Sequence, residues 1–152
     1  MKTLILAAAA ALLIAGPASA AAPAADAGLL LVGKAGGSDM FVGDNSWTRR
    51  GDEVEVWLFT AHEPQEFGGA LIAGSWMRVV IDCTARNFHI REVVGLRSDL
   101  TVGISSEVSE PGGDIRAGTN IDSALKLVCQ NDDSEVMSRV PGVAAAFERR
   151  RT

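Results

Sequence analysis

Three segments of the chain alternate apolar and polar residues, and this pattern constrains the fold more than any other feature. They are Glu53–His62, Ser75–Cys83 and Asn87–Leu96. A period of two is that of a β-strand with one face turned toward a core. About three residues separate the second and third segments, which fits an antiparallel hairpin. The centre of the chain is therefore predicted to form an antiparallel sheet.

Weaker signals add further strands on both sides of this centre. Leu29–Gly33, Met40–Gly43 and Leu100–Val108 are short apolar or alternating runs, so the sheet is predicted to have about six strands. Pro64 and its polar neighbours at 63–66 are predicted to end the first long strand, with the loop continuing through 67–69. The segment Glu110–Asp114 is predicted to be another loop.

After these strands the period changes to that of a helix. Thr119-Asn120 can cap a helix through a side-chain oxygen, and Asp122 lies in its first turn, where the helix dipole favours an acid. Helical spacing then joins Ile121, Ala124, Leu125, Val128 and Cys129, and the helix is predicted to end near Gln130-Asn131. Strands followed by a helix indicate an α+β fold, an antiparallel sheet with a C-terminal helix packed on one face.

The first 20 residues have the pattern of a secretory signal peptide. Lys2 precedes an apolar run, and Ala18-Ser19-Ala20 matches a small-residue cleavage site. The alternative is a transmembrane anchor, but the run is short for one. No cysteine precedes Cys83, so no lipid anchor is expected. The short run and the cleavage site favour a signal peptide, so no transmembrane anchor is expected either. The prediction is a periplasmic or secreted protein, cleaved after Ala20.

Three further segments are predicted after the signal peptide. Residues 21–28 are rich in Ala and Pro and are predicted to be a disordered lead-in. A single α+β domain is predicted over 29–131, followed by a tail over 132–152 in which Val143–Arg151 could form a short helix. The basic run Arg149–Arg151 is interpreted as a solvated end.

The two cysteines are interpreted as a disulfide. Cys83 ends the second long strand and Cys129 ends the helix, each on the apolar side, and an oxidising compartment favours pairing. A redox pair would need the C-x-x-C arrangement, which is missing. A zinc site with His62 and His89 lacks the usual ligand spacing. No metal and no cofactor are therefore expected.

Charge and chemistry restrict the function class. The chain has 14 Lys+Arg and 19 Asp+Glu, a net charge of -5, which argues against a nucleic-acid binder. Ser75 lacks a nucleophile elbow, and neither histidine is placed beside a partner acid, so no catalytic residue is predicted. An enzyme would need a polar pocket in which His62 or His89 meets a carboxylate or a serine. Another alternative is a structural component of the cell envelope. Such a protein would be a homo-oligomer that self-associates through an open sheet edge.

A candidate binding surface follows from the strand faces. Trp57 and Trp76 lie opposite the more aliphatic faces, and exposed aromatic residues anchor interfaces. The full candidate surface is Trp57, Trp76, Arg78, His89 and Arg91. The alternative for the two tryptophans is core packing. The predicted partner is a protein or another ligand of the cell envelope.

Three stretches together resemble the bacterial surface-adhesin protein E family. They are FVGDNSWTRRGDEVEVWLF, MRVVIDCTARNFHIREV and AGTNIDSALKLVC, which span about Leu29 to Cys129. The resemblance implies a curved antiparallel sheet whose closing helix is tethered to the concave side by a Cys83–Cys129 disulfide. It also implies an exported binding protein that acts by surface recognition. No binding residue of the family carries over to this sequence.

Overall fold

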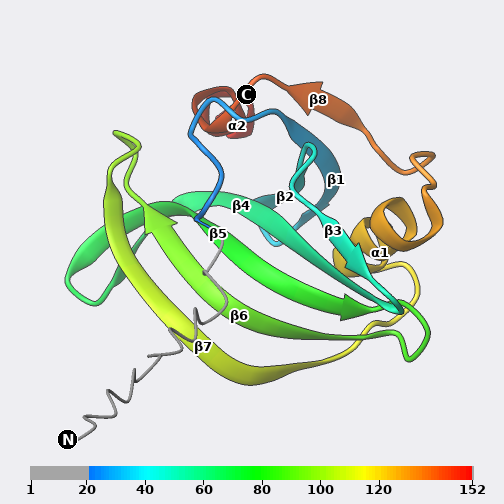
Figure 1. Ribbon diagram of the computed structural model, residues 1–152. Coiled ribbons are helices and arrows are strands. Elements are labelled where there is room, and N and C mark those ends of the chain that lie inside the picture. Colours follow the sequence, from blue (N-terminus) through cyan, green and yellow to red (C-terminus); the bar gives the residue numbers. More distant parts are fainter. Residues whose placement is uncertain (1–20, 152) are drawn as a thin grey trace, which may run out of the picture.

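One antiparallel sheet of eight strands forms the centre of the protein, and two helices pack against it (Figure 1). The computed structural model describes residues 21–151. The strands are β1 (Leu29–Ala35), β2 (Ser38–Gly43), β3 (Thr48–Arg50), β4 (Glu53–Phe67), β5 (Ala70–Asp82), β6 (Asn87–Leu96), β7 (Val102–Asp114) and β8 (Ser138–Val140). The helices are α1 (Asn120–Gln130) and α2 (Val143–Arg150). The predicted fold class is confirmed, with eight strands in place of about six.

The sheet runs in the order β7-β6-β5-β4-β2-β1-β8, and the short strand β3 pairs with β4. Every pair of neighbouring strands in the sheet is antiparallel. The long strands β5, β6 and β7 bend along their length, so the sheet is curved (Figure 1). The three alternating segments of the sequence became β4, β5 and β6, the centre of this sheet.

Most of two predicted loops is strand instead, and only Gly68-Gly69 at the end of the first form a turn. β4 continues through Pro64 to Phe67, and β7 continues through Pro111 to Asp114. A proline has no N–H for the ladder, and each interruption is absorbed by a local shift in pairing. The β4–β5 register shifts between Ala61 and Gln65, around Pro64. The β6–β7 register shifts next to Pro111.

Each face of the sheet carries its own core, because successive side chains of a strand point to opposite faces. The face under α1, here called the α1 face, buries Leu30, Val32, Val42, Val54, Val56, Leu58, Val79, Ile81, Ile115, Ala124, Leu125, Leu127 and Val128. The opposite α2 face buries Leu29, Leu31, Phe41, Trp57, Phe59, Ala61, Ala73, Trp76, Val94, Leu96, Val143, Ala146 and Phe147.

The two ends of the described chain are part of this fold, unlike the predicted lead-in and tail. The N–H of Val143 donates to the carbonyl of Ala25 (2.8 Å), and the N–H of Asp44 donates to that of Gly28 (2.7 Å). β8 pairs with β1, and Phe147 of α2 lies against the ring of Phe59 (5.8 Å between centroids). The tail therefore completes the α2-face core. The predicted signal peptide lies outside the described residues.

The helix α1 begins and ends close to the predicted residues. Thr119 is its N-cap, and the N–H of Asp122 donates to the Thr119 hydroxyl. Asn131 ends it in the left-handed conformation, with its N–H bonded to the carbonyl of Lys126. The first turn lies directly on β1: a Cβ at Gly33 would come within 2.2 Å of the Asn120 side chain.

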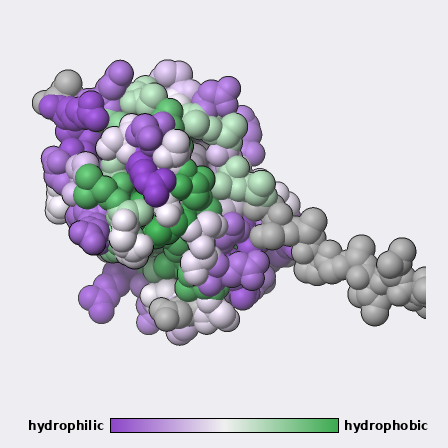
Figure 2. All heavy atoms as spheres, turned by 90° about the vertical axis from the view of Figure 1, so that its left-hand side faces the viewer, coloured by the Kyte–Doolittle hydropathy of each residue, from purple (hydrophilic) through white to green (hydrophobic). Residues whose placement is uncertain are grey.

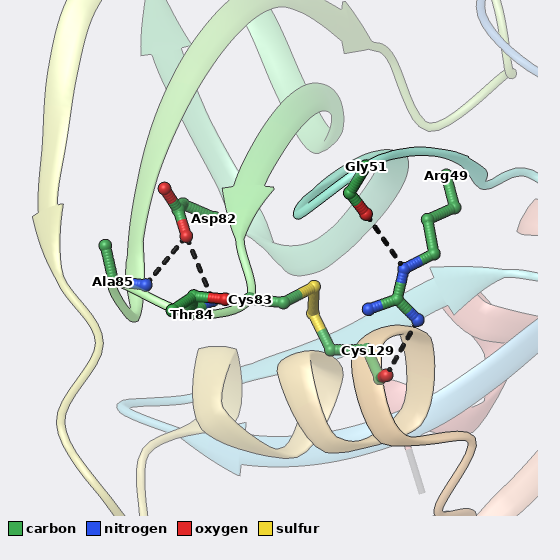
Figure 3. Close-up of a disulfide and its surroundings, with 7 residues drawn as sticks. All are labelled: Arg49, Gly51, Asp82, Cys83, Thr84, Ala85 and Cys129. Carbon is green, nitrogen blue, oxygen red and sulfur yellow. Dashed lines mark hydrogen bonds between the residues drawn. A yellow bond between two sulfur atoms is a disulfide. The ribbon is translucent and has the colours of Figure 1, made fainter.

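The disulfide between Cys83 and Cys129 fastens the other end of α1 to the end of β5 (Figure 3). The two Cα atoms are 5.7 Å apart, and the predicted pairing is confirmed. Arg49 of β3 reaches the same helix end, where its Nη1 donates to the Cys129 carbonyl (3.1 Å). A cation at this position complements the negative end of the helix dipole. Both contacts hold α1 to one end of the sheet.

A candidate binding groove on the α1 face

An open apolar groove of about 650 Å³ lies on the α1 face, next to the first turn of the helix. Eleven residues of α-helix are only about 16 Å long, so α1 covers part of the sheet and leaves the rest open. The groove is lined by Lys34, Ala35, Met40, Leu58, Met77, Val79, Phe88, Ile90, Gly118, Thr119, Asn120 and Ile121. This groove is named the α1-face groove below.

The apolar floor of the groove crosses five neighbouring strands, from β6 through β5, β4 and β2 to β1. On one side Ile90 pairs with Val79, and in the middle Met77 pairs with Leu58. Met40 continues the row on β2. Met40, Met77, Phe88, Ile90 and Ile121 are only half-buried. The molecule therefore leaves several apolar side chains of one groove partly in contact with solvent, around the buried Leu58 and Val79.

Lys34 is the charged residue of the groove lining, and its ammonium group pairs with Asp39. Lys34 lies at the β1 end, and its Nζ is 3.8 Å from Oδ2 of the buried Asp39. Asp39 shares its strand face with Phe41, which belongs to the α2-face core. The remaining polar members of the lining are Thr119 and Asn120 at the start of α1. The groove therefore offers mainly apolar contact.

The two tryptophans of the predicted binding surface are core residues, so that part of the prediction is wrong. Trp57 is 4% exposed and Trp76 is 1% exposed, both within the α2-face core. Their rings meet edge to face at 6.4 Å. The core that buries them includes Val143, Ala146 and Phe147 of α2, and Phe147 meets Phe59 of β4.

The three polar members of that prediction gather at the uncovered end of the same face. Nε of Arg78 donates to Oε2 of Glu92 (3.1 Å), and its Nη1 donates to Glu55 (3.4 Å). Arg78 and the exposed Arg91 line one shallow cavity of about 190 Å³. Arg91 and the half-buried His89 line another of about 260 Å³. This end mixes acids and bases, and its role in binding stays a prediction.

His62 lies in a separate polar cavity of about 360 Å³, together with Glu63, Ser98 and Arg150. Its Nδ1 is 2.8 Å from the backbone carbonyl of Glu63, while the carboxylate of Glu63 pairs with Arg150 (2.6 Å). Among the described residues, no hydrogen bond joins the His62 ring to Ser98 or to a carboxylate. The cavity thus holds the residue types that an enzyme would need, without the nucleophile–base contact that activates one.

Large apolar side chains are also exposed where two hairpins end. Phe67 and Leu71 flank the β4–β5 turn, and Val102 follows the β6–β7 turn. Figure 2 views the molecule from the side on which these turns lie, and apolar atoms gather near the middle of that face among hydrophilic ones. Leu71 is 58% exposed and does not line the α1-face groove, so it provides a matched control site.

Beside the groove, a buried carboxylate fixes the start of α1. Asp122 is 1% exposed, and it accepts hydrogen bonds from the Gly118 N–H (2.9 Å) and from Nη2 of Arg86 (2.6 Å). Lys126 also pairs with it at 3.5 Å. The Gly118 N–H, followed by Arg86 and Lys126, holds the pKa of Asp122 below its ordinary value of 3.8. These contacts join the helix to the β5–β6 turn.

Replacing Asp122 by asparagine is expected to lower the free energy of unfolding by about 1–3 kcal/mol, because a charge-assisted hydrogen bond is lost and Arg86 turns to water. The pH dependence should change as well. The depressed pKa stabilises the fold above about pH 3.8, and this contribution is lost as the pH falls toward the folded-state pKa. Urea unfolding between pH 2 and 7 should therefore show that Asp122→Asn loses less free energy of unfolding than the wild type as the pH falls. Equal acid loss in both proteins would contradict this.

Residues 21–151 contain no group of three or more His, Cys, Asp or Glu that could hold a metal ion. No helix in that range is long and apolar enough to cross a membrane. Comparison of the chain with protein-family models, with curated proteins and with solved structures found no match. The resemblance to surface-adhesin protein E therefore stays a prediction from the residues quoted above.

Proposed function

We propose that this protein is an exported binding protein that takes up an apolar ligand in the α1-face groove. The observation that carries the proposal is the groove itself, an open cavity of about 650 Å³ with an apolar floor. Ligand sites of small molecules are concave, mostly apolar and about 300–1,000 Å³ in volume. Recognition would then depend on burial of apolar surface rather than on the tryptophans predicted from the sequence.

The exposure of the groove supports a binding role. Each Å² of apolar surface that stays in water rather than being buried gives up about 25 cal/mol of stabilising free energy. The half-buried Met40, Met77, Phe88 and Ile90 all line this one groove rather than being scattered over the surface. Methionine adapts its shape to different partners, which suits a binding floor. A ligand would recover the burial that α1 is too short to provide.

The disulfide supports export. A bridge such as Cys83–Cys129 persists in oxidising compartments and is rare in the cytosol of most organisms. It agrees with the signal peptide predicted at residues 1–20 and with the resemblance to an exported family. The periplasm or the cell exterior is therefore the proposed location.

The edge strand β7 argues against the self-association alternative. An open edge invites pairing with a second copy unless bulges, prolines or charges interrupt it. The β6–β7 ladder shifts register at three places, and β7 carries Pro111 and the exposed Glu107. These features leave no long regular edge. Binding is thus favoured over a structural, polymerising role.

The neutral dye N-phenyl-1-naphthylamine tests the groove directly. The oxidised protein is expected to bind it saturably, with about one dye per chain, and its fluorescence should rise on transfer to an apolar site. Met77→Lys should weaken binding about tenfold or more. When the dye binds, the new ammonium group in the middle of the floor either loses its hydration or keeps the lysine side chain in the space that the dye needs. The measurement is a fluorescence titration at neutral pH.

Leu71→Lys is the matched control, since it also replaces an apolar side chain of β5 by lysine, at an exposed site outside the groove. Its dye affinity should stay within about twofold of the wild type. Thermal unfolding confirms that both variants are folded. No saturable binding by the wild type, or equal loss in the two lysine variants, would overturn the proposal.

A further inference from the structure

We infer that the polar cavity around Arg150 is a second binding site, which takes the carboxylate group of a small organic acid. The cavity lies beside Phe147 and Ala73 of the α2-face core, and its lining shares no residue with the α1-face groove. The inference therefore goes beyond the proposed function and is tested independently of it. It is carried by a bulge in β4, by the burial of Arg150 and by the carboxylate that Arg150 already holds.

The bulge in β4 supplies one wall of the cavity. The β4–β5 register shift between Ala61 and Gln65 leaves three residues of β4 opposite Ala73. All three line the cavity: His62, Glu63 and Pro64. Bulges are frequent next to functional sites, because the extra residues turn side chains out of the regular ladder. The irregular part of β4 is therefore the part that faces the cavity.

The opposite wall is the basic end of α2. Arg150 departs from the solvated end that the sequence predicts for 149–151, because its side chain is only 14% exposed. Arg151 lines the same cavity. The two guanidinium groups meet a single acidic residue of the lining, Glu63. The cavity thus has a surplus of positive charge, in a chain whose net charge is -5.

The present partner of Arg150 indicates which chemical group the cavity takes. Nη2 of Arg150 donates to Oε1 of Glu63 (2.6 Å), but the Glu63 side chain is 72% exposed. An exposed ion pair contributes little free energy, so Glu63 can turn into solvent at small cost. The planar fork of an arginine matches a carboxylate through two parallel hydrogen bonds. Glu63 therefore holds, in the free protein, the place that a ligand carboxylate would take.

The remaining lining suits an organic acid with a short apolar part. Pro64, Ala73 and Phe147 offer apolar contact, and Ser98 adds a hydroxyl group. Inorganic phosphate would leave the apolar side of the cavity unused. An uncharged alcohol would leave the guanidinium groups without a new partner. A short monocarboxylate uses both sides.

Butyrate provides the test. It is titrated into the oxidised protein at constant ionic strength, because salt screens exposed charges. Nuclear magnetic resonance follows the backbone amides of Ser98 and Arg151 and the side-chain Nε–H of Arg150. These signals should shift saturably. Butanol, which lacks the charge, and inorganic phosphate, which lacks the apolar part, should each bind at least about threefold more weakly.

Arg150→Gln should weaken butyrate binding about tenfold or more, because a hydrogen bond between two charged groups is lost. Arg116→Gln makes the same change at an exposed arginine outside the cavity, and its affinity should stay within about twofold of the wild type. Thermal unfolding checks that both variants are folded.

Glu63→Gln should strengthen butyrate binding about three- to fivefold, because it removes the carboxylate that competes for Arg150. Glu66→Gln is the matched control, an exposed glutamate of β4 outside the cavity, and should change the affinity by less than about twofold. A gain in affinity cannot arise from a loss of folded protein. It therefore separates a binding site from a purely structural ion pair.

The possible results leave the two sites distinguishable. No saturable shift with butyrate, or a Glu63→Gln variant that binds no better than the wild type, would overturn the inference. Phosphate that binds more tightly than butyrate would overturn the assignment to a carboxylate. The titration with N-phenyl-1-naphthylamine reports on the α1-face groove alone, so failure of either site leaves the other standing.

Discussion

Replacing Cys83 and Cys129 together by serine is expected to lower the free energy of unfolding by about 4 kcal/mol. The bridge closes a chain segment of 46 residues, and a loop of that length gives about this value from the entropy of the unfolded chain. The loss is large compared with the total stability of a small domain, about 5–15 kcal/mol. Urea unfolding of the oxidised protein and the double variant measures it.

The position of the bridge makes the effect local as well as global. An isolated helix of 11 residues is marginal in water, and α1 depends on its contacts with the sheet. Without the bridge, Arg49 and the buried Asp122 still hold α1, so the variant should fold but exchange the amide hydrogens of α1 faster. Because α1 forms one wall of the groove, dye affinity should fall as well.

Two controls distinguish the bridge from a side effect of the substitutions. Wild-type protein kept reduced should lose the same stability as the double serine variant. Protein taken from the native cell envelope should have an intact mass that lacks the first 20 residues and two further hydrogens, which return on reduction. A difference below about 1 kcal/mol between oxidised and reduced protein would show that the bridge is not a main source of stability.

The sequence was informative where local patterns and burial agree. The period of two in β4, β5 and β6 is long enough to specify strands, and the Thr119 cap with Asp122 in the next turn specifies the start of α1. The disulfide followed from the apolar positions of its cysteines. Each of these signals depends on residues close together in the chain, or on residues of rare type.

The features that the sequence did not reveal depend on distant pairing. β8 and β3 are three residues each, and their strand conformation exists only because β1 and β4 supply partners. Pro64 and Pro111 mark loops by composition, yet a register shift in the sheet accommodates both. Local composition cannot report how a neighbouring strand adjusts to such a residue.

The candidate site shows the same limit. Alternation in β4 and β5 separates two faces but does not say which face packs against a core. In the structure each face carries a core of its own. Trp57 and Trp76 are buried in the α2-face core, to which the predicted tail contributes Val143, Ala146 and Phe147 of α2. The groove arises where α1 stops short on the opposite face, near Met77. Its existence depends on where a helix lies on a sheet, which no local pattern encodes.

Trp76→Ala is expected to lower the free energy of unfolding by about 3–5 kcal/mol, the usual cost of removing a large aromatic side chain from a core. Trp76 is 1% exposed, lies 5.0 Å from the ring of Phe59 and meets Trp57 edge to face. Trp76→Phe should cost less, since it keeps an aromatic ring in the same position. Urea unfolding of both variants measures the difference.

The same variants decide between a core role and a binding role for this residue. Trp76 lies on the α2 face and the groove lies on the α1 face, so Trp76→Phe should bind N-phenyl-1-naphthylamine as the wild type does. A binding residue would give the opposite pattern, with little loss of stability and a large loss of affinity. That pattern would place the functional surface on the aromatic face after all, and the tail that covers it would have to move to admit the ligand.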